Sequence, residues 1–149
     1  MADIFDKATR SQMMSNIRGM NTQPEVRVRS FLHKQGFRFR VHVKTLPGKP
    51  DIVLPKHRVV ILVHGCFWHG HDCCLFKWPK TRQQFWKKKI EGNKKNDGRI
   101  LASFKKADWR VAVVWECALK GRNRLDNEVF IKRLVRWIQG NSAFIEIKA

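Results

Sequence analysis

Residues 64–74 constrain this chain more than any other segment, because they concentrate side chains that bind metal ions. These residues hold three of the six histidines and three of the four cysteines. Cys66, His71 and Cys73 are spaced so that three ligands can surround one zinc ion. The fourth ligand must come from elsewhere, and Cys117 is the only cysteine outside the segment. Three sulfurs and one nitrogen form the closed ligand set of a structural zinc site.

Two alternatives stay open for this segment. Cys74 competes with Cys117 for the fourth position, and the cysteines can also be unrelated buried thiols. The compact spacing favours zinc. Phe67, Trp68 and His69 lie between the candidate ligands, and the metal does not need them. We therefore expect these three side chains to be exposed on the loop and to have a functional role.

The charge of the chain indicates a polyanionic partner. The sequence has 31 Lys and Arg against 12 Asp and Glu, a formal net charge of +19. Residues 77–106 carry eleven Lys or Arg and only Glu91 and Asp97 as acids. An imbalance of this size favours nucleic acid. A surface that is basic without binding anything is the alternative.

Length and composition predict one domain, residues 1–149, away from membranes. A chain of 149 residues with 43% hydrophobic residues can bury a core of its own. No apolar run reaches the length of a membrane span, and the first residues have no apolar signal segment. We therefore expect a cytoplasmic, nucleoid-associated monomer, whose cysteines stay reduced and serve as ligands.

Hydrophobic periodicity predicts an α/β sandwich with a mixed sheet of about four strands. Thr22 and Glu25 match a capping box, which begins a helix that Gly36 can end. Strands are expected at residues 37–44, 51–54, 58–63 and 109–115. Further helices are expected at residues 8–20, at residues 81–106, with a break near Gly92 or Gly98 as an option, and at residues 125–139.

A second group of residues offers the side chains that phosphodiester hydrolysis needs. Asp51 opens a short strand after a turn and His64 ends the next one, so the two can approach each other. A carboxylate beside main-chain carbonyls can hold magnesium, which neutralises a phosphate and activates a water. His69 or His64 can accept the proton of that water. Asp97 is the best candidate to orient His69.

Each of these residues also has an ordinary structural explanation. Asp51 fits a turn after Pro50, and Glu25 fits the capping box without any chemistry. His64 can bond to a buried carbonyl group, and Asp97 can be a solvated charge on a helix. Their combination beside a basic surface favours a catalytic site.

At these residues the chain resembles the very-short-patch-repair (Vsr) endonucleases, a family of mismatch-specific DNA nicking enzymes. The resemblance extends from the N-terminus to about residue 139. Its most specific segments are His64-Gly65-Cys66-Phe67-Trp68-His69 and Trp115-Glu116-Cys117-Ala118-Leu119. Further matching segments are Asp6-Lys7-Ala8-Thr9-Arg10-Ser11, Phe39-Arg40-Val41, Leu46-Pro47-Gly48-Lys49-Pro50-Asp51, Leu75-Phe76-Lys77 and Trp109-Arg110-Val111.

The resemblance implies a restriction-endonuclease-like core of the PD-(D/E)xK superfamily, with a mixed central sheet flanked by helices and a structural zinc site. Pro50-Asp51 supplies the first motif, and Leu62-Val63-His64 stands where the superfamily usually has Glu-x-Lys. By the same resemblance, Asp51 and the main-chain carbonyl of Val63 hold magnesium, and the catalytic residues are Asp51, His69, His64, Glu25 and Asp97. His69 is the implied general base, Asp97 supports it, and the implied zinc ligands are Cys66, His71, Cys73 and Cys117.

The resemblance also implies contacts with DNA. Phe67 and Trp68, with Met14 from an N-terminal DNA-contacting arm at residues 1–20, wedge into the base stack, and Trp86 contributes to groove contacts. A mismatch is already deformed, so unstacking costs less there and the distortion itself discriminates. Burial of Phe67 and Trp68 in the core is the alternative.

The implied activity is a magnesium-dependent nick 5′ to the thymine of a T·G mismatch in double-stranded DNA, of the kind left by deamination of 5-methylcytosine. A cytosine-5 DNA methyltransferase and a repair DNA polymerase are the implied functional partners. Two other classes are kept: a restriction-like endonuclease that cuts matched duplex, and a zinc-stabilised DNA-binding protein without enzymatic activity.

Overall fold

A buried parallel strand pair forms the centre of the fold. The computed structural model describes residues 21–149, so the predicted arm at residues 1–20 and Met14 lie outside the described residues. Val59–His64 (β3) pairs in parallel with Arg110–Trp115 (β4), from Val59 opposite Arg110 to His64 opposite Trp115. The continuous apolar run of β3 predicted a strand covered on both faces, and nearly every residue of it is buried.

The complete sheet has five strands in the order β1-β2-β3-β4-β5. Arg40–Val41 (β1), Ile52–Leu54 (β2) and β3 are antiparallel neighbours. Phe144–Ile147 (β5) adds a parallel strand beside β4. The sheet is therefore mixed, as the sequence predicts, with one strand more than expected.

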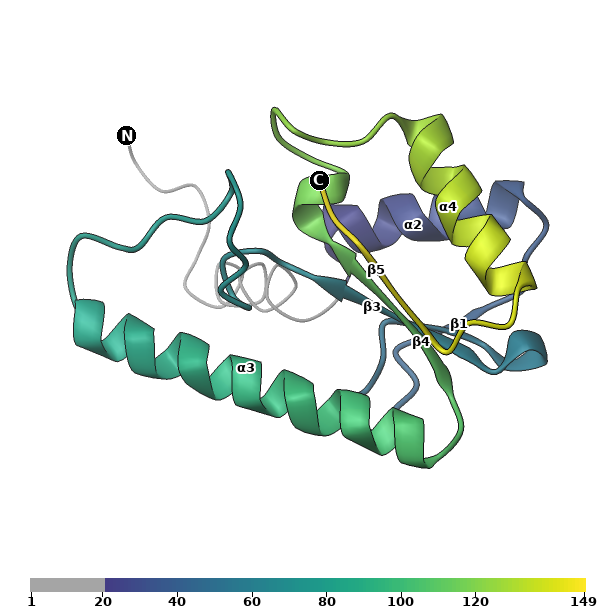
Figure 1. Ribbon diagram of the computed structural model, residues 1–149, viewed down its shortest axis with the longest axis horizontal. Coiled ribbons are helices and arrows are strands. Elements are labelled where there is room, and N and C mark those ends of the chain that lie inside the picture. The colour runs from purple at the N-terminus through teal and green to yellow at the C-terminus, as the bar shows by residue number, and fades with distance from the viewer. Residues whose placement is uncertain (1–20) are drawn as a thin grey trace, which may run out of the picture.

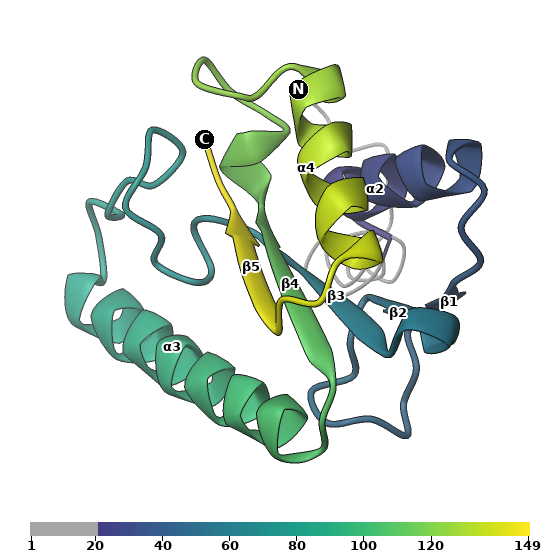
Figure 2. The same ribbon diagram turned by 45° about the vertical axis from the view of Figure 1, so that its right-hand side comes forward.

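Helices cover both faces of this sheet (Figures 1 and 2). Gln23–Lys34 (α2) and Asn127–Gln139 (α4) lie together on one face, where the larger hydrophobic core forms. Gln83–Lys106 (α3) crosses the other face, and its fully buried Phe104 anchors a smaller core. Short 3₁₀ turns follow β2 at Pro55–His57 and β4 at Glu116–Ala118. Within residues 21–149, no helix is both long enough and apolar enough to span a membrane.

The capping box is confirmed at the start of α2. Thr22 is the N-cap residue, and its side chain accepts a hydrogen bond from the backbone N–H of Glu25. This bond satisfies one of the backbone N–H groups that the first turn of α2 leaves without a helical partner. Glu25 is buried in the first turn, although acids are seldom buried without a partner or a function.

The predicted strand at residues 37–44 is wrong over most of its length. Only Arg40 and Val41 pair with β2. His42 follows with a left-handed backbone, φ 51°, and such a conformation ends an extended strand. The alternating pattern nonetheless has a structural basis, because Phe37 and Phe39 pack on one core and Val43 on the other.

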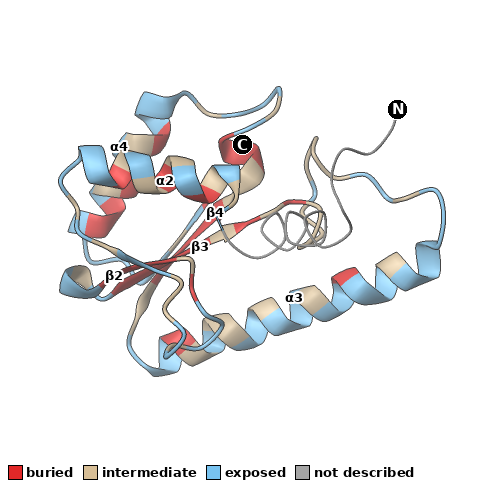
Figure 3. Cartoon of the chain, turned by 180° about the vertical axis from the view of Figure 1, so that it is seen from behind, coloured by how far each residue is buried: buried red, intermediate tan, exposed pale blue. Residues whose placement is uncertain are grey.

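The helix α3 runs for 24 residues without a break. Gly92 and Gly98 lie on its exposed side, where a Cβ atom would meet nothing within 4 Å. Each glycine therefore costs the helix only its intrinsic preference, about 1 kcal/mol. Phe104 packs the helix on the sheet, and the other buried residue of the helix, Ile90, lies against the loop at Gly70. Most of its surface remains exposed (Figure 3), so its many basic side chains can reach a polyanion.

Candidate active site and cysteine cluster

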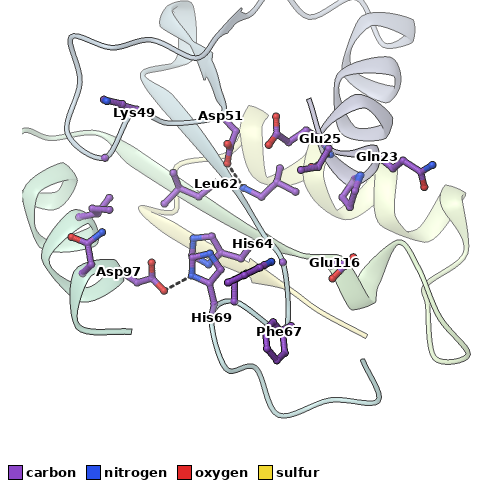
Figure 4. Close-up of a pocket in the computed structure, with 18 of the residues that line it drawn as sticks. Gln23, Glu25, Lys49, Asp51, Leu62, His64, Phe67, His69, Asp97 and Glu116 are labelled. Carbon is purple, nitrogen blue, oxygen red and sulfur yellow. Dashed lines mark hydrogen bonds and ion pairs between the residues drawn. The ribbon is translucent and has the colours of Figure 1, made fainter. Parts of the chain in front are cut away.

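A cleft of about 840 Å³ opens at the end of β3, between the start of α2 and the middle of α3. All five acidic and imidazole side chains that the sequence predicts for catalysis line it: Glu25, Asp51, His64, His69 and Asp97. Val63, the predicted main-chain ligand, lines it too. Figure 4 shows Asp51 and Glu25 on one side of the cleft and the His69–Asp97 pair on the other. The structure thus brings together residues up to 72 positions apart, from 25 to 97.

Asp51 is held rigidly at the start of β2. Its Oδ2 atom accepts a hydrogen bond of 2.7 Å from the backbone N–H of Val63. Burial, and then repulsion from the neighbouring Glu25 carboxylate, raises the pKa of Asp51 to about 7. Two carboxylates crowded in a buried place are unfavourable as a pair of anions. A cation placed between them would relieve this repulsion.

The donor set of this corner suits a hard divalent cation. Ligand atoms of Glu25, His42 and Asp51 lie within 4.8 Å of one another, and carboxylate oxygens are the ligands that magnesium prefers. The residues at this corner therefore fit the metal ion that the sequence analysis expects at Asp51. His42 is a member of this group that the sequence analysis missed, because nothing in its surroundings in the sequence distinguishes it.

His69 and Asp97 form a pair suited to proton transfer. Nδ1 of His69 lies 2.5 Å from Oδ2 of Asp97, so the carboxylate accepts the Nδ1 hydrogen and Nε2 is left as a base. The ring of His64 stacks on that of His69, with centroids 3.9 Å apart and planes 6° apart. Burial, and then the neighbouring His69, lowers the pKa of His64 to about 3. His64 is therefore neutral and does not oppose a positive charge on His69.

The cysteine cluster includes three residues of the loop after β3 that also carries His69. Ligand atoms of Cys66, His71, Cys73 and Cys117 lie within 4.8 Å of one another. The register of β3 and β4 explains this, because both parallel strands end at the same edge of the sheet, with His64 opposite Trp115. Cys74 is not in the group, so the described structure favours Cys117 in the competition for the fourth position.

The chemistry of these four side chains fits zinc. Burial raises the pKa of the Cys66 thiol and that of the Cys117 thiol, while burial lowers the pKa of His71. Burial thus disfavours the charged forms of these two thiols and of this imidazole in the absence of a cation. A bound zinc ion converts such thiols to thiolates and favours neutral imidazole as a ligand.

Two polar residues that the sequence analysis missed tie this loop to the fold. Oε1 of Glu116 accepts a hydrogen bond of 3.2 Å from the backbone N–H of Cys66. The side chain of Asn93 on α3 donates one of 2.8 Å to the carbonyl oxygen of Trp68. Both contacts join residues far apart in the sequence, so local patterns give no sign of them. They fix the loop between β4 and α3.

The aromatic residues of the loop belong to a larger aromatic surface. Phe67 packs on Trp86 with ring centroids 5.3 Å apart, and Trp68 packs on the same ring at 5.8 Å. Phe67 and Trp68 are both half-buried, so neither full exposure nor burial in the core describes them. The surface continues through Phe76, Trp78 and Phe85. Trp78 and Phe85 are about half exposed, at 51% and 47%, and basic residues surround them in the sequence.

Comparison with known proteins places this arrangement among nucleases. The sequence model of a family described as DNA mismatch endonuclease Vsr matches residues 2–75. The chain is 48% identical over 147 residues to the DNA mismatch endonuclease Vsr of Escherichia coli (strain K12), an alignment that covers 99% of this chain and 94% of that protein. It is 48% identical over 126 residues to the Type II nicking enzyme V.XorIIP of Xanthomonas oryzae pv. oryzae, covering 85% of this chain and 93% of that protein. It is 45% identical over 139 residues to the Type II nicking enzyme V.NmeAIP of Neisseria meningitidis, covering 93% and 98%.

Proposed function

This chain belongs to the DNA mismatch endonuclease Vsr family, and from that premise we propose that it nicks one strand of duplex DNA 5′ to the thymine of a T·G mismatch. The nick leaves a 5′-phosphate and a 3′-hydroxyl, and it begins a very short patch of repair. The observation that supports this most is the single cleft that holds Asp51, Glu25 and the His69–Asp97 pair next to an aromatic loop. The cleft therefore offers a binding place for a cation, a side chain that can accept a proton, and an aromatic surface that can contact the nucleobases of DNA.

The arrangement of Asp51 and β3 supports a restriction-endonuclease-like core of the PD-(D/E)xK superfamily. Asp51 lies at the start of β2, and the antiparallel neighbour β3 carries Leu62, Val63 and His64 at the cleft. In this alignment Leu62 takes the position of the superfamily's acid and His64 that of its lysine. We therefore assign the acidic share of metal binding to Asp51 and Glu25, with the main-chain carbonyl of Val63 as a further ligand.

Each residue of the cleft has its own role in the proposed reaction. Asp51 would hold a magnesium ion, which would supply positive charge for the scissile phosphate and help to activate a water. His69 accepts the proton of the attacking water at Nε2, since Nδ1 is bonded to Asp97. Asp97 keeps that tautomer and stabilises the imidazolium that forms. His64, neutral and stacked on His69, holds the ring in place and can hydrogen-bond a phosphate oxygen.

The cysteine cluster has a structural role in this proposal. Cys66, His71, Cys73 and Cys117 offer four ligands to zinc, so no position is left open for a reacting water. The zinc then fixes residues 66–73 to the end of β4. Since His69 and the two aromatics lie within that segment, the zinc site controls the geometry of the cleft without taking part in the chemistry.

DNA binding is assigned to the basic helix α3 and to the aromatic loop. Phe67 and Trp68 insert beside the mismatch, Trp86 supports them from α3, and Met14 remains a proposed contact outside the described residues. A cytosine-5 DNA methyltransferase is the proposed functional partner, since the T·G mismatch arises when 5-methylcytosine is deaminated. A repair DNA polymerase would extend from the 3′-hydroxyl.

The nick itself tests the proposed function. T·G duplexes with different flanking bases, labelled on each strand in turn, are incubated with the protein and magnesium, and matched T·A duplexes serve as the control. We expect one nick, 5′ to the mispaired thymine, in at least one sequence context. Cleavage of both strands of the T·A duplex would support a restriction-like enzyme instead. Binding without any cleavage across the panel would support a DNA-binding module.

Removing Trp68 should weaken mismatch recognition more than general DNA binding. One stacked base contributes roughly 1–3 kcal/mol, so we expect Trp68→Ala to raise the Kd for a T·G duplex about tenfold and the Kd for a T·A duplex much less. Equilibrium binding in EDTA measures both constants. Trp78→Ala is the matched control, since Trp78 is an exposed tryptophan on the same surface. Equal losses for the two duplexes in Trp68→Ala would show that this ring does not read the mismatch.

A further inference from the structure

The carboxylate of Glu25 is held by a cluster of groups that the proposed reaction does not yet use. Its Oε2 atom accepts hydrogen bonds from Nη2 of Arg29 at 2.9 Å and from the backbone N–H of Asn21 at 3.1 Å. Nε2 of His42 lies 3.6 Å from the same oxygen. Glu25 is only 2% exposed, so these contacts determine where its carboxylate points.

Arg29 is the centre of this cluster. Besides Glu25, its guanidinium reaches Oδ1 of Asn21 and Nε2 of His42, each at 2.9 Å. A guanidinium can only donate hydrogen bonds, so Nε2 of His42 acts as the acceptor. His42 therefore orients Arg29 and does not form an ion pair with Glu25. The backbone N–H of His42 in turn donates to the carbonyl oxygen of Asp51 at 3.3 Å.

The local structure explains why these residues meet. Glu25 and Arg29 are four residues apart on α2, so their side chains lie on the same side of the helix. The left-handed backbone of His42, φ 51°, ends β1 and leaves that residue beside the start of β2. The same conformation that shortens β1 thus places an imidazole next to Arg29 and next to the backbone of Asp51.

The geometry points to Arg29 and His42 as positioning residues for Glu25, which keep its carboxylate turned toward Asp51 in the cleft. Two buried carboxylates repel each other, and Glu25 can lower that repulsion by rotating away from Asp51. The permanent charge and planar fork of Arg29 oppose this rotation. This inference rests on the proposed function, since it assigns Glu25 a role beside the metal ion at Asp51.

A competing interpretation makes His42 itself a metal ligand, together with Glu25 and Asp51. The position of Arg29 argues against it. Nη2 of Arg29 lies 2.9 Å from both Oε2 of Glu25 and Nε2 of His42, so a guanidinium already fills the place between those two atoms. A divalent cation would then approach the pair of acids from the side of Asp51.

Two variants with a matched control test this inference. Arg29→Ala removes the charge and the fork, and Arg29→Lys restores the charge alone. Arg27→Ala is the control, because Arg27 lies on the same helix but bonds to the Leu119 carbonyl and to Asn127 instead. Four properties are compared with wild type: the melting temperature, the Kd for a T·G duplex, the affinity for Mn²⁺ without DNA, and the single-turnover nicking rate at saturating protein.

Groups that orient metal ligands typically change metal affinity or activity by 10- to 100-fold when removed. We expect Arg29→Ala to lower the single-turnover rate and the Mn²⁺ affinity about tenfold or more, with the DNA Kd nearly unchanged and partial recovery in Arg29→Lys. Arg27→Ala should lower only the melting temperature. If Arg29→Ala does not fold, His42→Leu carries the same test, with a smaller loss expected from the loss of the acceptor.

The outcomes separate this inference from the proposed function. Wild-type rate and Mn²⁺ affinity in a folded Arg29→Ala or His42→Leu variant would overturn the positioning role. Equal losses of rate in Arg27→Ala would reduce it to a general effect of helix stability. If wild type fails to nick any T·G duplex, the proposed function fails, while the Mn²⁺ affinities still decide whether Arg29 positions Glu25.

Discussion

Replacing Asp51 by Asn should abolish nicking while mismatch binding persists. The change keeps the shape of the side chain but removes the negative charge that holds the metal ion. Metal-ion catalysis contributes several kcal/mol to such a reaction, and each 1.4 kcal/mol is a tenfold change in rate. We therefore expect the single-turnover rate on a T·G duplex to fall about a thousandfold or more. The Kd for the same duplex, measured without magnesium, should stay close to the wild-type value.

The stability of this variant provides its control. The pKa of Asp51 is raised to about 7 by burial and then by Glu25, so the folded protein without metal binds a proton that the unfolded chain releases near pH 4. The carboxyl group therefore destabilises the fold increasingly as the pH rises from about 4 to 7. Asp51→Asn should melt above wild type at pH 8 and close to it at pH 4, both in EDTA. A variant that melts far below wild type at both values would mean that lost activity reflects unfolding.

Removing a zinc ligand should disable the enzyme by another route. Cys117 is completely buried in the 3₁₀ turn after β4, and Cys117→Ser should release the zinc and free residues 66–73 from the sheet. A loss of about 4 kcal/mol corresponds to a melting temperature roughly 10 °C lower for a chain of this size. Nicking should fall together with zinc content, because His69 and the aromatic loop lose their support. Metal analysis and thermal melting on the same preparation measure both effects.

Cys74→Ser is the matched control for this change. Cys74 neighbours the cluster in the sequence but is not a member of it, so this variant should keep its zinc, its melting temperature and its activity. Retention of zinc in Cys117→Ser and its loss in Cys74→Ser would show that the fourth ligand is assigned to the wrong cysteine.

Much of the fold follows from local patterns in the sequence. The capping box of Thr22 and Glu25 marks the start of α2, and the apolar run of β3 marks a strand covered on both faces. Both features can be read from residues that lie within a few positions of one another in the sequence. The break that was kept as an option near Gly92 or Gly98 does not occur in α3, because tertiary contacts of Ile90 and Phe104 outweigh the cost of two exposed glycines. β5 was missed because its four residues expose Phe144 and Glu146 and bury only Ile147 fully.

The candidate site was likewise predicted only in part from the sequence. Types and spacing of residues were enough to predict that Asp51, His64 and His69 gather in one place, since neighbouring strands and one short loop carry them. The same reasoning placed Glu25 and Asp97 in the candidate site, and the resemblance to the family then implied catalytic roles for both. The groups that hold these residues, Arg29 and His42, were not predicted, because they act across turns and strand ends that the sequence pattern does not fix. Their roles depend on a left-handed backbone at His42, which no local sequence pattern predicts.

The central claim is that two metal sites have separate roles. Zinc stabilises the loop, and a divalent cation bound at Asp51 is required for hydrolysis. The most direct test measures nicking of a T·G duplex by protein that has been dialysed free of loosely bound cations and analysed for zinc. We expect about one zinc per chain, a folded protein and no nicking, with activity restored when magnesium is added. Full activity of the dialysed protein without any added cation would contradict the account, because zinc alone would then suffice for the chemistry.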